Sequence, residues 1–135
     1  NNNNYTIFRP TLIYGEGDTH GSYGPNRFLR QIKENNKIIL FGKGLDTRDH
    51  IHIEDVVDLI FKISGKRSEG IFNLATGNSH SFLSVAKKFK KHDKNINLQF
   101  INNNNKPSKR KFDIRKLKKF KSKFLHIDIG INKYF

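Results

Sequence analysis

Residues 41–58 read FGKGLDTRDHIHIEDVVD, and this stretch decides the fold class. It predicts a strand over 37–41 that ends in a glycine turn, a second short strand over 50–53, and a helix over 54–64. Acidic residues begin the helix, where the helix dipole favours negative charge. The predicted helix places Val56, Ile60 and Ile63 on one apolar face, with Val57 and Phe61 beside them.

Outward from this stretch, strands and helices continue to alternate. Strands are predicted over 5–9, 70–74 and 96–101, and residues 14–26 form a loop rich in Gly, Asp and Ser. Pro25 suits the first turn of one helix, and Ser81 suits the N-cap of another. Asp113 is expected to cap a last helix that carries Ile114 and Leu117. This alternation predicts an α/β fold.

Charge is distributed unevenly along the 135 residues. Residues 1–80 hold 10 Lys or Arg and 9 Asp or Glu, whereas residues 81–135 hold 16 and 3. A basic half of this kind suggests nucleic acid as a partner. In and directly after the lysine-rich stretch 106–123, Phe112, Phe120 and Phe124 are interleaved with lysines, a pattern also found in proteins that bind single-stranded nucleic acid. Compositional drift and a solvated helix face explain the same pattern, and we favour them.

Composition also limits the cellular setting and the sites that the chain can build. The sequence has no Cys, which excludes disulfides and thiolate metal sites. It has no signal peptide and no apolar run of the ~20 residues that a membrane span needs, so we expect a cytoplasmic protein without a membrane partner. Met is absent even at position 1, so we expect a fragment of a longer protein.

Catalytic motifs are missing from the 135 residues. No glycine-rich dinucleotide turn occurs, and neither Tyr5…Arg9 nor Tyr23…Arg27 forms a credible helical Tyr-x-x-x-Lys pair. His50 and His52 share a strand face, but without a third nearby ligand we predict no metal site.

Two residues of the opening stretch could bind a nucleotide. Arg48 can clamp a phosphate, and Phe41 can stack on a base. Alternatively, Arg48 pairs with Asp46 or Asp49, and Phe41 belongs to the core.

Four segments in order carry a resemblance to a known family. The stretches FRPTLIYGEGD, GPNRFLRQI, FGKG…TRDHIHIEDVVDLI and GIFNLATGNSHSFLSVAKKF resemble consecutive segments of the extended short-chain dehydrogenases/reductases, which include the NAD-dependent nucleotide-sugar epimerases and dehydratases. The resemblance runs from about residue 5 to 89 and thins beyond 90. It implies that 5–10 end a Rossmann sheet and that 11–135 form the C-terminal substrate-binding lobe, within one partial domain.

The resemblance also implies roles for particular residues. Arg9, Pro10 and Tyr14 match positions beside the nicotinamide of NAD or NADP. Asn26, Phe41 and Arg48 match substrate contacts, namely a diphosphate or sugar contact, the wall of the base pocket and the diphosphate clamp.

The family's cofactor fingerprint and its catalytic Tyr-x-x-x-Lys pair precede these segments. We therefore expect no catalytic residue in this chain, a nucleotide sugar as substrate of the whole enzyme, and a homodimer. Leu12 stands where many members have a substrate-binding Asn, which makes a standard UDP-sugar substrate less secure. The alternatives are a standalone basic nucleic-acid-binding module and a non-functional gene fragment.

Overall fold

The computed structural model describes residues 5–21 and 23–135. The strands in these ranges are β1 (Thr6–Pro10), β2 (Leu12–Tyr14), β3 (Lys37–Phe41), β4 (Thr47–His52), β5 (Gly70–Leu74), β6 (Ser79–Ser81) and β7 (Asn97–Ile101). The helices are α1 (Gly24–Asn35), α2 (Ile53–Gly65), α3 (Phe82–His92) and α4 (Ile127–Asn132), with a 3₁₀ turn, η1, at Arg115–Leu117.

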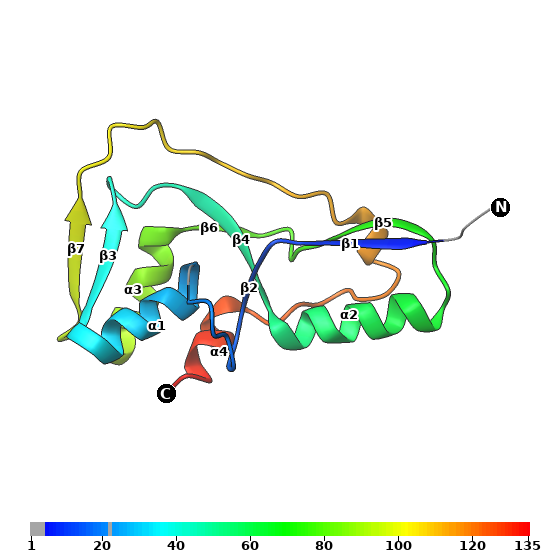
Figure 1. The fold of residues 1–135 in the computed structure, drawn as a ribbon, viewed down its shortest axis with the longest axis horizontal. Coiled ribbons are helices and arrows are strands. Elements are labelled where there is room, and N and C mark those ends of the chain that lie inside the picture. The colour runs from blue at the N-terminus through cyan, green and yellow to red at the C-terminus, as the bar shows by residue number, and fades with distance from the viewer. Residues whose placement is uncertain (1–4, 22) are drawn as a thin grey trace.

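The strands form three small groups that follow one another along the molecule. β1 pairs with β5 in parallel, β4 lies between parallel β2 and antiparallel β6, and β3 pairs with β7 in parallel. Figure 1 shows β3 and β7 at one end, β1 and β5 with α2 at the other, and β4 running between them. The predicted α/β class is confirmed.

Local signals place the helix starts. Pro25 occupies the first turn of α1, where its missing N–H costs nothing. The Ser81 hydroxyl accepts a hydrogen bond from the Ser84 N–H at 3.1 Å, as predicted for an N-cap of α3. His52 caps α2, since its Nδ1 accepts from the Glu54 N–H at 3.3 Å.

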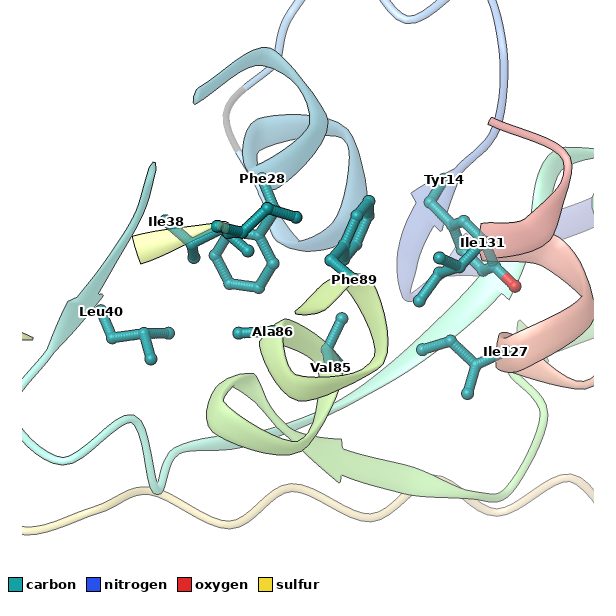
Figure 2. Packing of buried hydrophobic residues seen from close by; sticks show 10 residues of the cluster. Tyr14, Phe28, Ile38, Leu40, Val85, Ala86, Phe89, Ile127 and Ile131 are labelled. Carbon is teal, nitrogen blue, oxygen red and sulfur yellow. The ribbon is translucent and has the colours of Figure 1, made fainter. Parts of the chain in front are cut away.

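Two separate apolar clusters hold the two ends of the molecule. The first joins α1, α3, α4 and β3, and Figure 2 shows Phe89 of α3 between Phe28 of α1 and the α4 side chains Ile127 and Ile131. The second joins α2, β4, β5 and the η1 region, and its members are Ile51, Val56, Leu59, Ile63, Phe72, Leu74, Leu117 and Phe120.

A buried carboxylate connects the strand groups. Asp49 of β4 accepts hydrogen bonds from the Thr76 N–H at 3.0 Å, the Thr76 hydroxyl at 2.9 Å and the Gly77 N–H at 2.7 Å. The Thr11 hydroxyl donates to the Asp49 carbonyl at 2.8 Å, and the Thr11 N–H donates to the Leu74 carbonyl at 3.0 Å. Burial raises the Asp49 pKa, although these donors oppose the rise.

The predicted inward face of the central helix is partly wrong. Val56 and Ile63 are buried, but Leu59 and Asp55 complete the buried face, while Val57, Ile60 and Phe61 are exposed. Lys121 and the Leu125 N–H bind the Asp55 carboxylate, at 3.1 and 2.8 Å, which allows an acid to face inward.

The C-terminal segment also departs from its prediction. Asp113 does not begin a full helix, because only η1 follows it, and the Asp113 carboxylate binds the Arg115 N–H at 2.9 Å and the Arg115 guanidinium. The prediction of a basic helix over 106–123 is therefore wrong.

The sequence did not reveal the short elements β2, β6 and α4, because they contain too few residues to show a periodic pattern. None of the helices described is long and apolar enough to cross a membrane.

Replacing Asp49 by Ala should lower the free energy of unfolding by about 2–4 kcal/mol, because two backbone N–H groups and a hydroxyl lose their acceptor. Urea denaturation of the variant and the parent chain checks this. Glu69→Ala, which removes an exposed carboxylate, is the matched control and should change stability by under ~0.5 kcal/mol. Equal effects of the two substitutions would contradict the assigned role of Asp49.

Candidate functional site

The amino end of α1 faces an open pocket of about 510 Å³. The pocket is bounded by the Gly15–Asp18 turn and by Asn26, Arg30 and Tyr134. Asn26 closes the turn, since its Oδ1 accepts from the Gly15 N–H at 3.1 Å and from the Tyr134 hydroxyl, while its Nδ2 donates to Asp18 at 2.7 Å. The predicted substrate residue Asn26 thus lines a pocket, but its amide is already engaged by the protein.

A smaller apolar pocket of about 90 Å³ lies on the other side of the α1 amino end. Phe41 forms one wall and is 47% exposed. The Arg27 guanidinium lies 5.1 Å from the centre of the Phe41 ring, a cation–π distance. Tyr23 and Phe82 add further aromatic surface. A planar ring bound in this pocket would therefore contact both the Phe41 ring and the Arg27 guanidinium.

Arg48 is partly buried at the beginning of β4. Its Nη1 donates to the Ser108 hydroxyl at 2.9 Å and to the Thr47 carbonyl at 2.8 Å. The Ser108 hydroxyl in turn donates to the Asp46 carboxylate at 2.7 Å, so Ser108 lies between Arg48 and Asp46. The direct pairing of Arg48 with Asp46 or Asp49 that the sequence left open is absent from the hydrogen bonds and ion pairs of the described residues.

The three residues predicted to contact a nicotinamide differ in accessibility. Arg9 and Pro10 are exposed at the carboxyl end of β1, where ligands of parallel sheets bind. Tyr14 is 1% exposed, and the centre of its ring lies 5.1 Å from the centre of the His52 ring. The Tyr14 hydroxyl has no hydrogen-bond partner. Arg9 and Pro10 are thus accessible to a ligand, but the 135 residues contain no glycine-rich turn that could hold a pyrophosphate.

Of the six predicted residues, the structure gathers three around α1. Asn26 and Tyr14 line one shared pocket of about 340 Å³, and Phe41 lines the apolar pocket beside it. Arg9, Pro10 and Arg48 line none of the three pockets described around α1. No group of three His, Cys, Asp or Glu in residues 5–21 and 23–135 is arranged to hold a metal ion.

The amino-acid sequence of the chain matches a known protein family. The profile of the NAD dependent epimerase/dehydratase family matches residues 1–75, more than half of the sequence. The chain belongs to the NAD-dependent epimerase/dehydratase family. It is also 30% identical over 134 residues to the ADP-L-glycero-D-manno-heptose-6-epimerase of Brachyspira hyodysenteriae, covering 90% of this chain and 42% of that protein.

Solved structures show the same fold at low sequence identity. The ADP-L-glycero-D-manno-heptose-6-epimerase of Helicobacter pylori superposes with a TM-score of 0.86 at 19% identity, over 99% of this chain and 44% of that chain. An NAD-dependent NDP-hexosamine 5,6-dehydratase of tunicamycin biosynthesis gives 0.84 at 21% identity, over 94% of this chain and 43% of that chain. The chain therefore spans less than half the length of these relatives.

Sequence patterns alone do not reveal several residues around the pockets. Arg27 follows Asn26 directly, yet its position over Phe41 depends on how α1 packs against β3. Asp18 and Tyr134, which fix the Asn26 amide, are 8 and 108 residues away from it along the chain. Only the concentration of Gly and Asp in 14–26 signalled a structured loop there.

Stability should depend on His50, which is 3% exposed. Burial lowers the His50 pKa to about 4, so the folded state keeps the ring neutral while the unfolded chain takes up a proton below its ordinary pKa of 6.5. Stability is therefore lost as pH falls from 6.5 towards 4, by about 2 kcal/mol between pH 7 and 5 from this residue alone.

Urea denaturation of the parent chain and of His50→Phe at pH 7 and pH 5 checks this. The variant should lose less stability than the parent over that interval, because the phenyl ring cannot take up a proton. His92→Gln, which alters an exposed histidine, is the control and should keep the parent's pH dependence. An unchanged pH dependence in His50→Phe would show that His50 is not the titrating group.

Proposed function

We propose that this chain is the substrate-binding segment of an NAD(P)-dependent nucleotide-sugar epimerase, dehydratase or reductase, and that the cofactor and the catalytic acid/base belong to a Rossmann half outside the 135 residues. The observation that carries the proposal is a set of exposed apolar side chains on α2 and its flanking strands, next to an open strand edge. Family membership and the coverage of the relatives support it.

The large apolar side chains left exposed in this part of the chain are Ile7 of β1, Ile13 of β2 and Val57, Ile60 and Phe61 of α2, and we call this set of residues the docking face. Phe61 is 80% exposed and Val57 is 58% exposed. Leaving such residues in water forfeits about 1.5–3 kcal/mol for each large side chain that could be buried. Within the described residues, β1 pairs only with β5, so its other edge is open for a further parallel strand.

Arg9 and Pro10 relate the docking face to the place where a cofactor would bind. Both are at the carboxyl end of β1, the edge at which parallel sheets bind dinucleotides. A Rossmann sheet continued through the open edge of β1 would bring its cofactor beside these two residues. The substrate would then lie between that cofactor and the pockets around α1.

On the substrate side, each proposed contact has a physical basis. Phe41 with Arg27 suits a nucleotide base, because a ring can stack on one and receive hydrogen bonds from the other. Arg48 can exchange its neutral partner Ser108 for a diphosphate, which binds a guanidinium more strongly than a hydroxyl does. Asn26 acts through the Gly15–Asp18 turn that it holds in place.

When bound, NAD or NADP supplies a hydride acceptor for a sugar carbon. The role of this chain is to hold the nucleotide and diphosphate so that the sugar is presented to that acceptor, because orientation lowers the barrier to transfer. The chain's share of the reaction is therefore positioning and specificity, and proton transfer falls to the Tyr-x-x-x-Lys pair of the Rossmann half.

The purified 135-residue chain should show no nucleotide-sugar-dependent reduction of NAD. A chimera in which this chain replaces the matched C-terminal part of the Brachyspira heptose epimerase should show it, since the chimera has both halves. Absorbance of NADH during single-turnover mixing checks both proteins. Turnover by the isolated chain would contradict the proposal.

In that chimera, Arg48→Ala should reduce kcat/KM by an amount equivalent to ~2–4 kcal/mol, because a buried charge pair with diphosphate is lost. Steady-state kinetics measure the change. Arg115→Ala is the matched control, since Arg115 is an exposed guanidinium that binds Asp113. Equal kinetics for Arg48→Ala and the parent chimera would remove Arg48 from the substrate site.

A further inference from the structure

The segment 127–135 returns to the pocket at the amino end of α1. Its helix, α4, packs on the first apolar cluster through Ile127 and Ile131, and Figure 2 shows Ile131 beside Tyr14. The turn that follows α4 carries Tyr134 into the wall of the pocket of about 510 Å³. Tyr134 and Asn26 are 108 residues apart along the chain, so only the fold brings these two side chains together.

The Tyr134 hydroxyl completes the hydrogen bonds of the Asn26 side chain. It donates to Asn26 Oδ1, which also accepts from the Gly15 N–H at 3.1 Å, and Asn26 Nδ2 donates to Asp18 at 2.7 Å. Burial raises the pKa of the Tyr134 phenol, so the hydroxyl keeps its proton and remains a donor. Both the oxygen and the nitrogen of the Asn26 amide therefore have protein partners, and these partners determine its orientation.

Two packing contacts fix the position of Tyr134. Its ring stacks on Phe89 of α3, with the ring centres 6.2 Å apart and the planes inclined by 16°. α4 lies so close to Tyr14 that a Cβ atom on Gly130 would come within 2.1 Å of the Tyr14 hydroxyl. Because α4 cannot move further towards Tyr14, the Tyr134 hydroxyl reaches Asn26 from a fixed direction.

We infer that Tyr134 is a positioning residue of the proposed nucleotide-sugar site: its hydroxyl fixes Asn26 and, through Asn26, the Gly15–Asp18 turn in the arrangement that the substrate binds. The inference rests on the proposed function, because it names a residue of the same site. Tyr134 acts through Asn26 and not on the reacting sugar carbon. It therefore supports binding of the ground state and of the transition state equally, which lowers KM and leaves kcat unchanged.

Steady-state kinetics of the chimera with the N-terminal part of the Brachyspira heptose epimerase test the inference. The probe is ADP-L-glycero-D-manno-heptose, the nucleotide sugar in the name of that epimerase. Tyr134→Phe keeps the ring on Phe89 and removes only the hydroxyl. KM should rise about three- to tenfold, as for the loss of one neutral hydrogen bond, with kcat changed by less than about twofold.

Two further variants show whether the hydroxyl acts through Asn26. In an Asn26→Ala background, Tyr134→Phe should raise KM by less than about 1.5-fold, because the acceptor is already gone. Lys133→Gln is the matched control, since Lys133 lies in the same turn but pairs with the exposed Glu54 at 2.5 Å and not with Asn26. This control should leave KM within about twofold of the parent value, as expected for an exposed ion pair.

Hydrogen exchange of the Gly15 amide in the 135-residue chain separates this inference from the proposed function. Tyr134→Phe should speed Gly15 exchange at least about threefold, whether or not the chimera turns over, because the Asn26 oxygen that binds the amide is then less well held. Unchanged Gly15 exchange would overturn the inference. So would an unchanged KM in Tyr134→Phe, an equal rise in Lys133→Gln, or full additivity with Asn26→Ala. A parent chimera without turnover contradicts the proposed function alone.

Discussion

The hydrogen bonds of the Asp49 carboxylate determine how the two parts of this chain are oriented. Asp49 lies on the central strand β4 and binds the turn that leaves β5, while its own carbonyl receives the Thr11 hydroxyl between β1 and β2. The β1–β5 pair and the β2–β4–β6 group thus meet at one residue. Because the carboxylate is fully buried, any rotation between the two groups would leave it and two backbone donors unsatisfied.

In the proposed function, this junction separates two surfaces with different roles. On one side are the docking face and the exposed end of β1, with Arg9 and Pro10. On the other side, the first apolar cluster fixes α1, α3 and α4 against one another (Figure 2) and so positions the pockets around Asn26 and Phe41. In the proposed enzyme, a rigid junction between them would let a cofactor bound at one surface meet a substrate held at the other.

Local pattern was sufficient to predict most long elements. The boundaries of β3 and β5 are those predicted, and Ser81 and Pro25 mark the starts of α3 and α1 because capping is a local interaction. The inward face of α2 was predicted less well, since apolar residues cover more than one side of the helix and only tertiary contacts select Leu59 and Asp55.

The candidate site could be predicted only in part, because its surroundings also depend on tertiary contacts. Phe41 and Asn26 were predicted as substrate contacts by resemblance, and that role stays a prediction; the structure shows only that they line neighbouring pockets. The contacts that define their surroundings, Arg27 over Phe41 and Tyr134 on Asn26, join segments that the sequence does not relate.

Amide hydrogen exchange tests most directly whether the docking face receives a Rossmann half. The N-terminal part of the Brachyspira heptose epimerase, produced separately, would be added to this chain and exchange compared with the chain alone. We predict slower exchange in β1 and α2, which carry the open strand edge and Phe61, with little change in β7. Unchanged exchange in β1 and α2, or protection confined to β3 and β7, would contradict the account.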